Sequence, residues 1–204
     1  MIVAATTDCF PDLSLTDALS RLTDLEYTSV EIALRETGTQ LKPSEVAENL
    51  DAAVAACTRN HRLTTTAYFV DPGNEEDPAY YDRFAACCQL AKATRVVTLA
   101  IPGAELGTPF NGEIERLRRM VKVAAADSLV VAVKTEIGKM TQDPDTVVVL
   151  CDNVPGLGVC LDPSHYICGP HAGGAYEQVL KYVRHVHLRD TTKDQLQVRV
   201  GQGE

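Results

Sequence analysis

Short apolar runs rich in β-branched residues alternate with longer amphipathic stretches along the whole chain. The short runs have the length of buried strands, whereas the longer stretches repeat apolar residues at helical spacing. The predicted strands cover residues 2–7, 29–34, 63–70, 95–101, 129–137, 157–161 and 184–188. The predicted helices cover residues 14–25, 43–60, 78–93, 111–126, 144–151 and 175–183. A strand and a helix recur in turn, which predicts a parallel sheet with right-handed crossovers.

The alternation leaves two architectures open, a (β/α)8 barrel and an open doubly wound sheet. A dinucleotide-binding fold of the second kind needs a glycine-rich loop after its first strand, and none follows residues 2–7. The sequence therefore favours a TIM-barrel-like α/β fold with about seven β-α units present. We expect residues 1–204 to form a single domain that lacks the last unit, because full barrels usually need about 250 residues.

Charge and composition narrow the classes of partner. The formal net charge is −9 and no run of lysine or arginine occurs, which argues against nucleic acid as a partner. No apolar run is long enough for a membrane span, and the first residues lack the basic region of a signal peptide. The seven cysteines include no Cys-x-x-Cys pair, so we expect reduced core thiols in a cytoplasmic protein. An incomplete barrel exposes strand edges, and a homo-oligomer is one way of covering them.

Residues that bind metals or move protons gather at the C-terminal ends of the last three predicted strands. Both candidate architectures place their sites at these ends. Glu136, Asp162 and His187 end successive strands that lie about 4.8 Å apart, so the three side chains can converge on one ion. Two carboxylates and an imidazole suit manganese, magnesium, cobalt or zinc. A solvated strand end, an Asp-Pro turn and a core histidine are the structural alternatives at the three positions.

Five segments form an ordered set of motifs along most of the chain. They are residues 29–32, 136–144, 158–165, 185–190 and 201–203. In this order they resemble the xylose isomerase-like TIM barrels, in particular the sugar phosphate isomerase/epimerase family. The resemblance implies a TIM barrel that holds one divalent metal ion (manganese, magnesium, cobalt or zinc) and binds a small sugar or sugar phosphate.

The resemblance also implies roles for individual residues. Glu136 matches a metal ligand that serves in addition as an acid/base, and Asp162 and His187 match two further ligands. The family's fourth ligand is a glutamate on strand eight, for which this sequence offers no counterpart. Glu204 comes too early in the chain to take that place.

Four residues are candidates for substrate binding. His165 matches a histidine that touches substrate oxygens in the family, and Arg199 matches an arginine that contacts substrate. Lys134, at the end of a predicted strand, and Asp190, in the segment after His187, complete the set. Ile137 departs from the family pattern, in which asparagine often follows the glutamate.

The leading hypothesis is a divalent-metal-dependent isomerase or epimerase of a small keto-sugar or sugar phosphate. Glu136 takes a proton α to the carbonyl and an ene-diolate forms. A sugar-acid or inosose dehydratase shares this first step. The alternative from another class is a catalytically degenerate barrel that binds a sugar or a protein. An apurinic-site endonuclease is less favoured, because the predicted strands that end near residues 70 and 101 carry no histidine there.

Overall fold

The computed structural model describes residues 2–59 and 62–203. The chain divides into two compact units. The first comprises Met1–Leu99 with Val123–Leu129, and the second comprises Ala100–Lys122 with Val130–Glu204. Asn60, the predicted end of a helix, and Glu204 lie outside the described residues.

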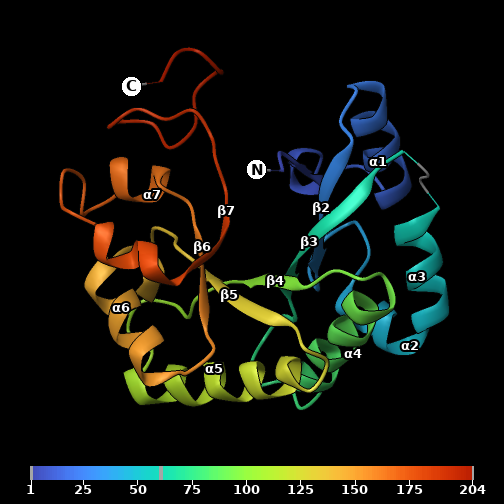
Figure 1. The fold of residues 1–204 in the computed structure, drawn as a ribbon, viewed down its shortest axis with the longest axis horizontal. Helices are drawn as coiled ribbons and strands as arrows, with labels where there is room; N and C mark the ends of the chain where they lie inside the picture. The colour runs from blue at the N-terminus through green and yellow to red at the C-terminus, as the bar shows by residue number, and fades with distance from the viewer. Residues whose placement is uncertain (1, 60–61, 204) are drawn as a thin grey trace. The chain divides into compact units, whose positions relative to one another are not determined.

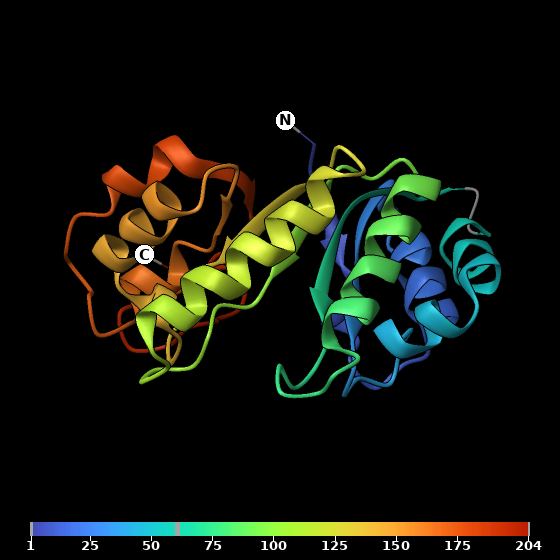
Figure 2. The same cartoon turned by 90° about the horizontal axis from the view of Figure 1, so that it is seen from below.

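Strands β1, β2 and β3 of the first unit pair in parallel and in sequence order. Figure 1 and Figure 2 show helices α1, α2 and α3 on one side of β2 and β3. The elements of this unit are β1 (Ala5–Thr6), η1 (Thr7–Cys9), α1 (Leu15–Asp24), β2 (Ser29–Arg35), α2 (Pro43–Glu48), α3 (Leu50–Thr58), β3 (Thr64–Asp71) and α4 (Tyr80–Ala93).

Helix α1 begins where the sequence predicts it. The Ser14 hydroxyl accepts the backbone N–H of Asp17 at 3.2 Å, which caps the first turn. The buried residues of α1 recur at helical spacing and face the core of the unit. Strand β2 is buried from Ser29 to Leu34, as expected for a parallel strand that is covered on both faces.

The single helix predicted over residues 43–60 is wrong, because α2 and α3 are separate helices. Asn49 leaves the helical conformation, with φ −148° and ψ 87°. Its side chain accepts the N–H of Ala52 at 3.0 Å and so caps a new helix. The asparagine side chain competes in this way with the backbone hydrogen bonds of a continuous helix. The spacing of apolar residues does not reveal this competition.

The second unit carries strands β5, β6 and β7, which pair in parallel in that order. Figure 1 shows α6 and α7 on one side of these strands. The elements are α5 (Phe110–Ala125), whose residues 123–125 are assigned to the first unit, β5 (Val130–Lys134), η2 (Met140–Gln142), α6 (Pro144–Asn153), β6 (Gly158–Leu161), α7 (Ser164–Ile167), η3 (Glu177–Tyr182) and β7 (Val183–Val186). Strand β4 (Thr98–Ile101) is divided between the two units.

Two predictions in the second unit are wrong in detail. The helix predicted over residues 175–183 is the 3-10 helix η3, and a short helix α7 that was not predicted follows the Asp-Pro pair. Strand β5 ends at Lys134, three residues before the predicted end. Thr135 and Glu136 therefore lie in the loop that follows the strand, where functional residues of such folds are placed.

The strands follow one another in sequence order from β1 to β7. A doubly wound sheet reverses its strand order at a switch point, so that alternative is wrong. Parallel strands that alternate with helices in this order form the predicted TIM-barrel-like α/β fold. Within the described ranges, no helix combines the length and the apolar character that crossing a membrane requires.

Candidate active site

Three neighbouring strands of the second unit present a row of side chains near their C-terminal ends. Lys134 of β5 is in register with Cys160 of β6, and Cys160 is in register with His185 of β7. Residues in register project from the same face of a parallel sheet. The three predicted metal ligands come two positions later, just beyond the ends of these strands.

Thr135 joins the ends of β5 and β6 just beyond this row. Its backbone N–H donates to the carbonyl of Cys160 at 3.1 Å, and its hydroxyl oxygen accepts the N–H of Asp162 at 2.8 Å. Thr135 is completely buried. These bonds hold the backbone of Asp162 in place where β6 ends.

The side chain of Asp162 is also completely buried, and both of its oxygens have donors. Oδ1 accepts the backbone N–H of Ser164 at 3.2 Å and the Ser164 hydroxyl. Oδ2 accepts Nη2 of Arg189 at 2.7 Å. A buried carboxylate needs such partners, because an unpaired buried charge costs several kcal/mol. Arg189 is therefore the counter-ion of Asp162.

His165 is held in one tautomer by the backbone. Its Nδ1 accepts the N–H of Ile137 at 3.0 Å, so the proton of the neutral ring is on Nε2. Nε2 lies 3.5 Å from Oδ2 of Asp162. Burial lowers the pKa of His165, against the opposite effect of the Asp162 charge. The ring is therefore a neutral imidazole, and its Nε2 is buried and has no hydrogen-bond partner among the described residues.

Glu136 and Lys134 form an ion pair at the end of β5. Nζ of Lys134 is 3.6 Å from Oε2 of Glu136, and the two side chains are 10% and 31% exposed. The charges of Lys134, Arg189 and Glu136 each affect the pKa of His165, and Glu136 immediately precedes Ile137, whose N–H donates to the ring. The site therefore combines an accessible carboxylate, two cations and a neutral donor.

The predicted ligands Glu136, Asp162 and His187 do not form a compact donor group. Ligand atoms around one ion lie about 3 to 4 Å apart. In the described part of the chain, the group of three potential ligands whose atoms lie within 4.8 Å of one another is Cys160, His185 and His187. Asp162 in addition gives both of its oxygens to protein donors. The three side chains are not gathered around one point, and their assignment as the metal site stays a prediction.

The remaining two predicted residues lie in the segment after β7. Asp190 accepts the backbone N–H groups of Gly201 and Gln202, and the carbonyl of Asp190 accepts that of Val198 at 2.8 Å. Arg199 is exposed on this loop. The structure thus uses the Asp190 carboxylate to hold the loop, while Arg199 stays a predicted substrate contact.

Sequence reasoning gave no role to Arg189 and treated Cys160 only as a core thiol. Arg189 follows His187 at the same two-residue spacing that separates His185 from His187, which is the signal that could have identified it. Cys160 was interpreted as a core thiol, and it is indeed buried. Its position opposite His185 in the strand register depends on the pairing of β6 with β7.

Comparisons with known proteins agree with this fold. The family model described as "Xylose isomerase-like TIM barrel" matches residues 19–204. A search of curated proteins found no match. Among solved structures, a D-tagatose 3-epimerase-like protein aligns with a TM-score of 0.72 at 14% identity, over 100% of this chain and 82% of that one.

Two further structures contain metals. A xylose isomerase-like TIM barrel protein from Mycobacterium smegmatis in complex with magnesium aligns with a TM-score of 0.73 at 12% identity, over 93% of this chain and 74% of that one. The IolI protein with a bound zinc atom aligns with a TM-score of 0.68 at 14% identity, over 98% of this chain and 80% of that one. Other similar structures include sugar epimerases and a dehydratase.

At these identities the solved structures establish the fold alone, whereas the family model covers most of the chain. The order of the strands and the position of the polar cluster at their C-terminal ends agree with that match. The chain belongs to the xylose isomerase-like TIM barrel family.

Proposed function

We propose that this protein is an isomerase or epimerase of a small keto-sugar or sugar phosphate. The reaction begins with removal of a proton α to a carbonyl and passes through an ene-diolate. The observation that carries the proposal is the accessible Glu136 carboxylate, which lies 3.6 Å from the Lys134 ammonium at the end of β5. The similarity to sugar epimerases supports the substrate class.

Glu136 is the proposed base. Its carboxylate is about one-third exposed and is therefore within reach of a substrate, whereas the neighbouring Lys134 is almost buried. Removing the α proton moves negative charge onto the carbonyl oxygen. The Lys134 ammonium is fixed beside the base and stabilises the negative charge on the oxygen more than it stabilises the neutral ketone. This difference lowers the activation barrier of the proton transfer.

His165 and Arg189 complete the proposed site. A neutral imidazole whose proton is fixed on Nε2 donates to a substrate hydroxyl or carbonyl oxygen and orients the sugar. Arg189 adds positive charge while it holds Asp162. Arg199, on the loop after β7, is the proposed contact for a phosphate when the substrate is a sugar phosphate.

A divalent ion, when bound, polarises a carbonyl and adds to this stabilisation. Its requirement remains part of the proposal, with manganese, magnesium, cobalt and zinc as the candidates. Asp162 is paired with Arg189 and the predicted ligands are not grouped, so the proposed proton transfer rests on Glu136 and Lys134. The cytoplasm is the proposed compartment, in agreement with the burial of most of the cysteines.

Exchange of the α proton with solvent tests the proposal directly. The purified chain is incubated in deuterium oxide with a panel of ketoses, aldoses, inososes and their phosphates, with and without added divalent metal. Deuterium at the carbon next to the carbonyl, followed by magnetic resonance, is the expected result. Glu136→Gln is expected to slow this exchange by about 100-fold or more.

Glu115→Gln is the matched control, because Glu115 is an exposed glutamate on α5 and should leave the exchange rate unchanged. Exchange that survives Glu136→Gln would show that another group is the base. Loss of the hydroxyl next to the labelled carbon would identify a dehydratase.

A sugar-binding barrel without catalysis is the second candidate. It is favoured by the Arg189–Asp162 ion pair, which occupies a carboxylate that the family uses for metal. This reading predicts saturable binding of a sugar with no deuterium incorporation for any substrate of the panel.

A further inference from the structure

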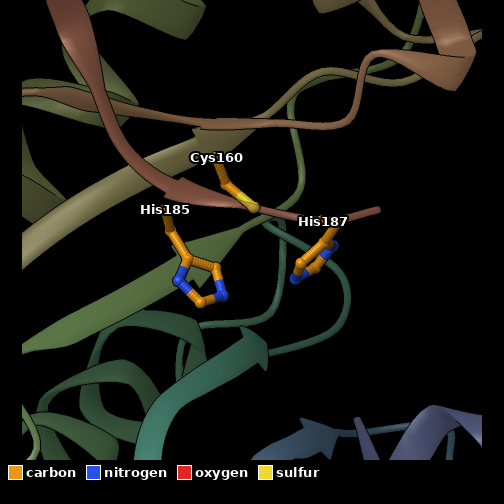
Figure 3. Close-up of side chains that lie close together, drawn as sticks. All are labelled: Cys160, His185 and His187. Atoms are coloured by element: carbon orange, nitrogen blue, oxygen red, sulfur yellow. The ribbon is translucent and has the colours of Figure 1, made fainter. Parts of the chain in front are cut away.

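A thiol and two imidazoles come together at the junction of β6 and β7. The ligand atoms of Cys160, His185 and His187 all lie within 4.8 Å of one another, and the two imidazole rings are 5.2 Å apart between centroids. Figure 3 shows that the three side chains lie close together and come from adjacent segments of the second unit. We propose that Cys160, His185 and His187 bind a soft divalent metal, zinc in the first place, at a site that shares only His187 with the predicted carboxylate set.

The backbone explains why these three side chains meet. Cys160 and His185 are partners in the β6–β7 register, and the irregularity between Val159 and Cys160 sets this pairing at the end of the two strands. His187 follows two residues later, so its side chain leaves the chain on the same side as His185. The His187 N–H donates to the carbonyl of Leu161 at 2.9 Å, which continues the strand pairing to this point. The cluster therefore rests on hydrogen-bonded backbone and not on a mobile loop.

The donor set selects the class of metal. One sulfur and two imidazole nitrogens suit zinc, whereas magnesium and manganese prefer oxygen ligands. At ordinary zinc bond lengths and tetrahedral angles, ligand atoms lie about 3.4 to 3.6 Å apart. Small side-chain rotations are enough to close a group that already lies within 4.8 Å. Three protein ligands leave a fourth position open for water or another small molecule.

Burial supports metal binding over a solvated cluster. Cys160 is completely buried, and both histidines are half-buried. Lys134 is the strand partner of Cys160 and carries a positive charge that would repel a metal ion. Its ammonium lies beside the Glu136 carboxylate, and the negative charge of that carboxylate offsets the repulsion. A reduced core cysteine in contact with histidines is the simpler reading, and it predicts no metal affinity at this position.

The proposed site has a consequence for the carboxylate set. His187 belongs to both sets, and one imidazole nitrogen cannot bind two ions at once. Zinc on Cys160 and His185 therefore removes His187 from any ion that Glu136 and Asp162 hold. The chain is expected to bind a single zinc through nitrogen and sulfur, and zinc is expected to inhibit the binding of a hard ion such as manganese.

Cobalt substitution of the full chain provides the test, because cobalt bound to a thiolate gives a sulfur-to-metal charge-transfer absorption band. The full chain, prepared without bound metal, is titrated with Co²⁺ and then with Zn²⁺. We expect one cobalt per chain, the charge-transfer band, and its loss on addition of zinc. Cys160→Ser is expected to abolish the band and to weaken zinc binding by more than about 100-fold.

Cys151→Ser is the matched control, because Cys151 is a buried cysteine on α6 outside the cluster and should leave the band unchanged. His185→Gln is the second variant, since His185 belongs only to the proposed site. Circular dichroism checks that each variant is folded. A band that persists in Cys160→Ser, or no band in the parent chain, would overturn the proposal.

The outcome is separable from that of the proposed function. Metal binding that is lost in Asp162→Asn and Glu136→Gln but retained in Cys160→Ser would refute the thiolate site and support the carboxylate set. Loss in Cys160→Ser and His185→Gln alone would support the thiolate site, whatever the result of the deuterium exchange experiment.

Discussion

Arg189 donates from Nη2 to Oδ2 of Asp162 over 2.7 Å, although the two residues lie 27 positions apart in the sequence. The carboxylate is completely buried and the arginine is one-quarter exposed. An ion at the carboxylate set would compete for the two oxygens of Asp162 with the guanidinium and with the Ser164 donors. Arg189 and a metal therefore compete for Asp162, which links the stability of the fold to the chemistry of the site.

Replacing Arg189 measures this competition. In Arg189→Gln the buried Asp162 loses its cationic partner, so we expect the free energy of unfolding to fall by about 2 kcal/mol in urea denaturation. Excess manganese should restore part of the loss, because the ion binds only the folded chain. Arg184→Gln removes an exposed arginine of β7 and is the control. Equal stability of the two variants would mean that the ion pair contributes little.

A second buried ion pair fixes the segment between β4 and α5. The carboxylate of Glu113 accepts Nε of Arg116 at 2.6 Å, and Arg116 donates in turn to the carbonyl of Pro102 at 3.0 Å. Both side chains are almost fully buried. Glu113→Gln leaves the guanidinium without a countercharge, so we expect a loss of about 3 kcal/mol. Thermal and urea unfolding of Glu115→Gln, on the exposed face of the same helix, should match the parent chain.

The loop after β7 should respond to acid through Asp190. The N–H groups of Gly203 and Gly201 hold the pKa of Asp190 below its ordinary value of 3.8. Because the pKa of Asp190 is lowered in the folded state, its carboxylate stabilises the loop fully above pH 3.8. This stabilisation is lost as the pH falls through the lower pKa of the folded state. Hydrogen exchange of residues 198–203, corrected for the intrinsic effect of pH, should therefore show protection that disappears in strong acid.

Asp190→Asn and Asp194→Asn form a matched pair for this prediction. The first variant should lose the loop protection near neutral pH as well, because an amide offers only one acceptor oxygen to the N–H groups that the carboxylate holds. Asp194 is exposed on the same segment, and its replacement should have no effect. Protection that is independent of pH in the parent chain would contradict the role of Asp190.

Most cysteines should be inert toward alkylation in the folded chain. None of the seven, all of which the structure describes, forms a disulfide. Burial raises the pKa of Cys57 to about 11 and those of Cys88 and Cys151 to about 12, so almost no thiolate is present at pH 8. A short iodoacetamide pulse followed by mass spectrometry should label the exposed Cys9 at least about tenfold faster. Rapid labelling of Cys57 would indicate local opening of the first unit.

The sequence by itself determined the order of the elements and the region of the site. Hydrophobic periodicity is a local property, so the strand from Ser29 and the helix after Ser14 could be located from apolar spacing and a capping residue. The same alternation implies parallel strands, whose C-terminal ends lie at one edge of the sheet, and this places Lys134, Glu136 and Asp162 in one region.

Tertiary structure decided which of these residues meet. The helix break at Asn49 depends on a side-chain bond that apolar spacing does not register. The contacts of Asp162 with Arg189 and of Cys160 with the two histidines depend on the pairing of β6 with β7. A shift of one residue in that register would send each side chain to the opposite face. Strand register is set by packing of the whole sheet. For that reason the local sequence located the site but did not determine which of its side chains contact one another.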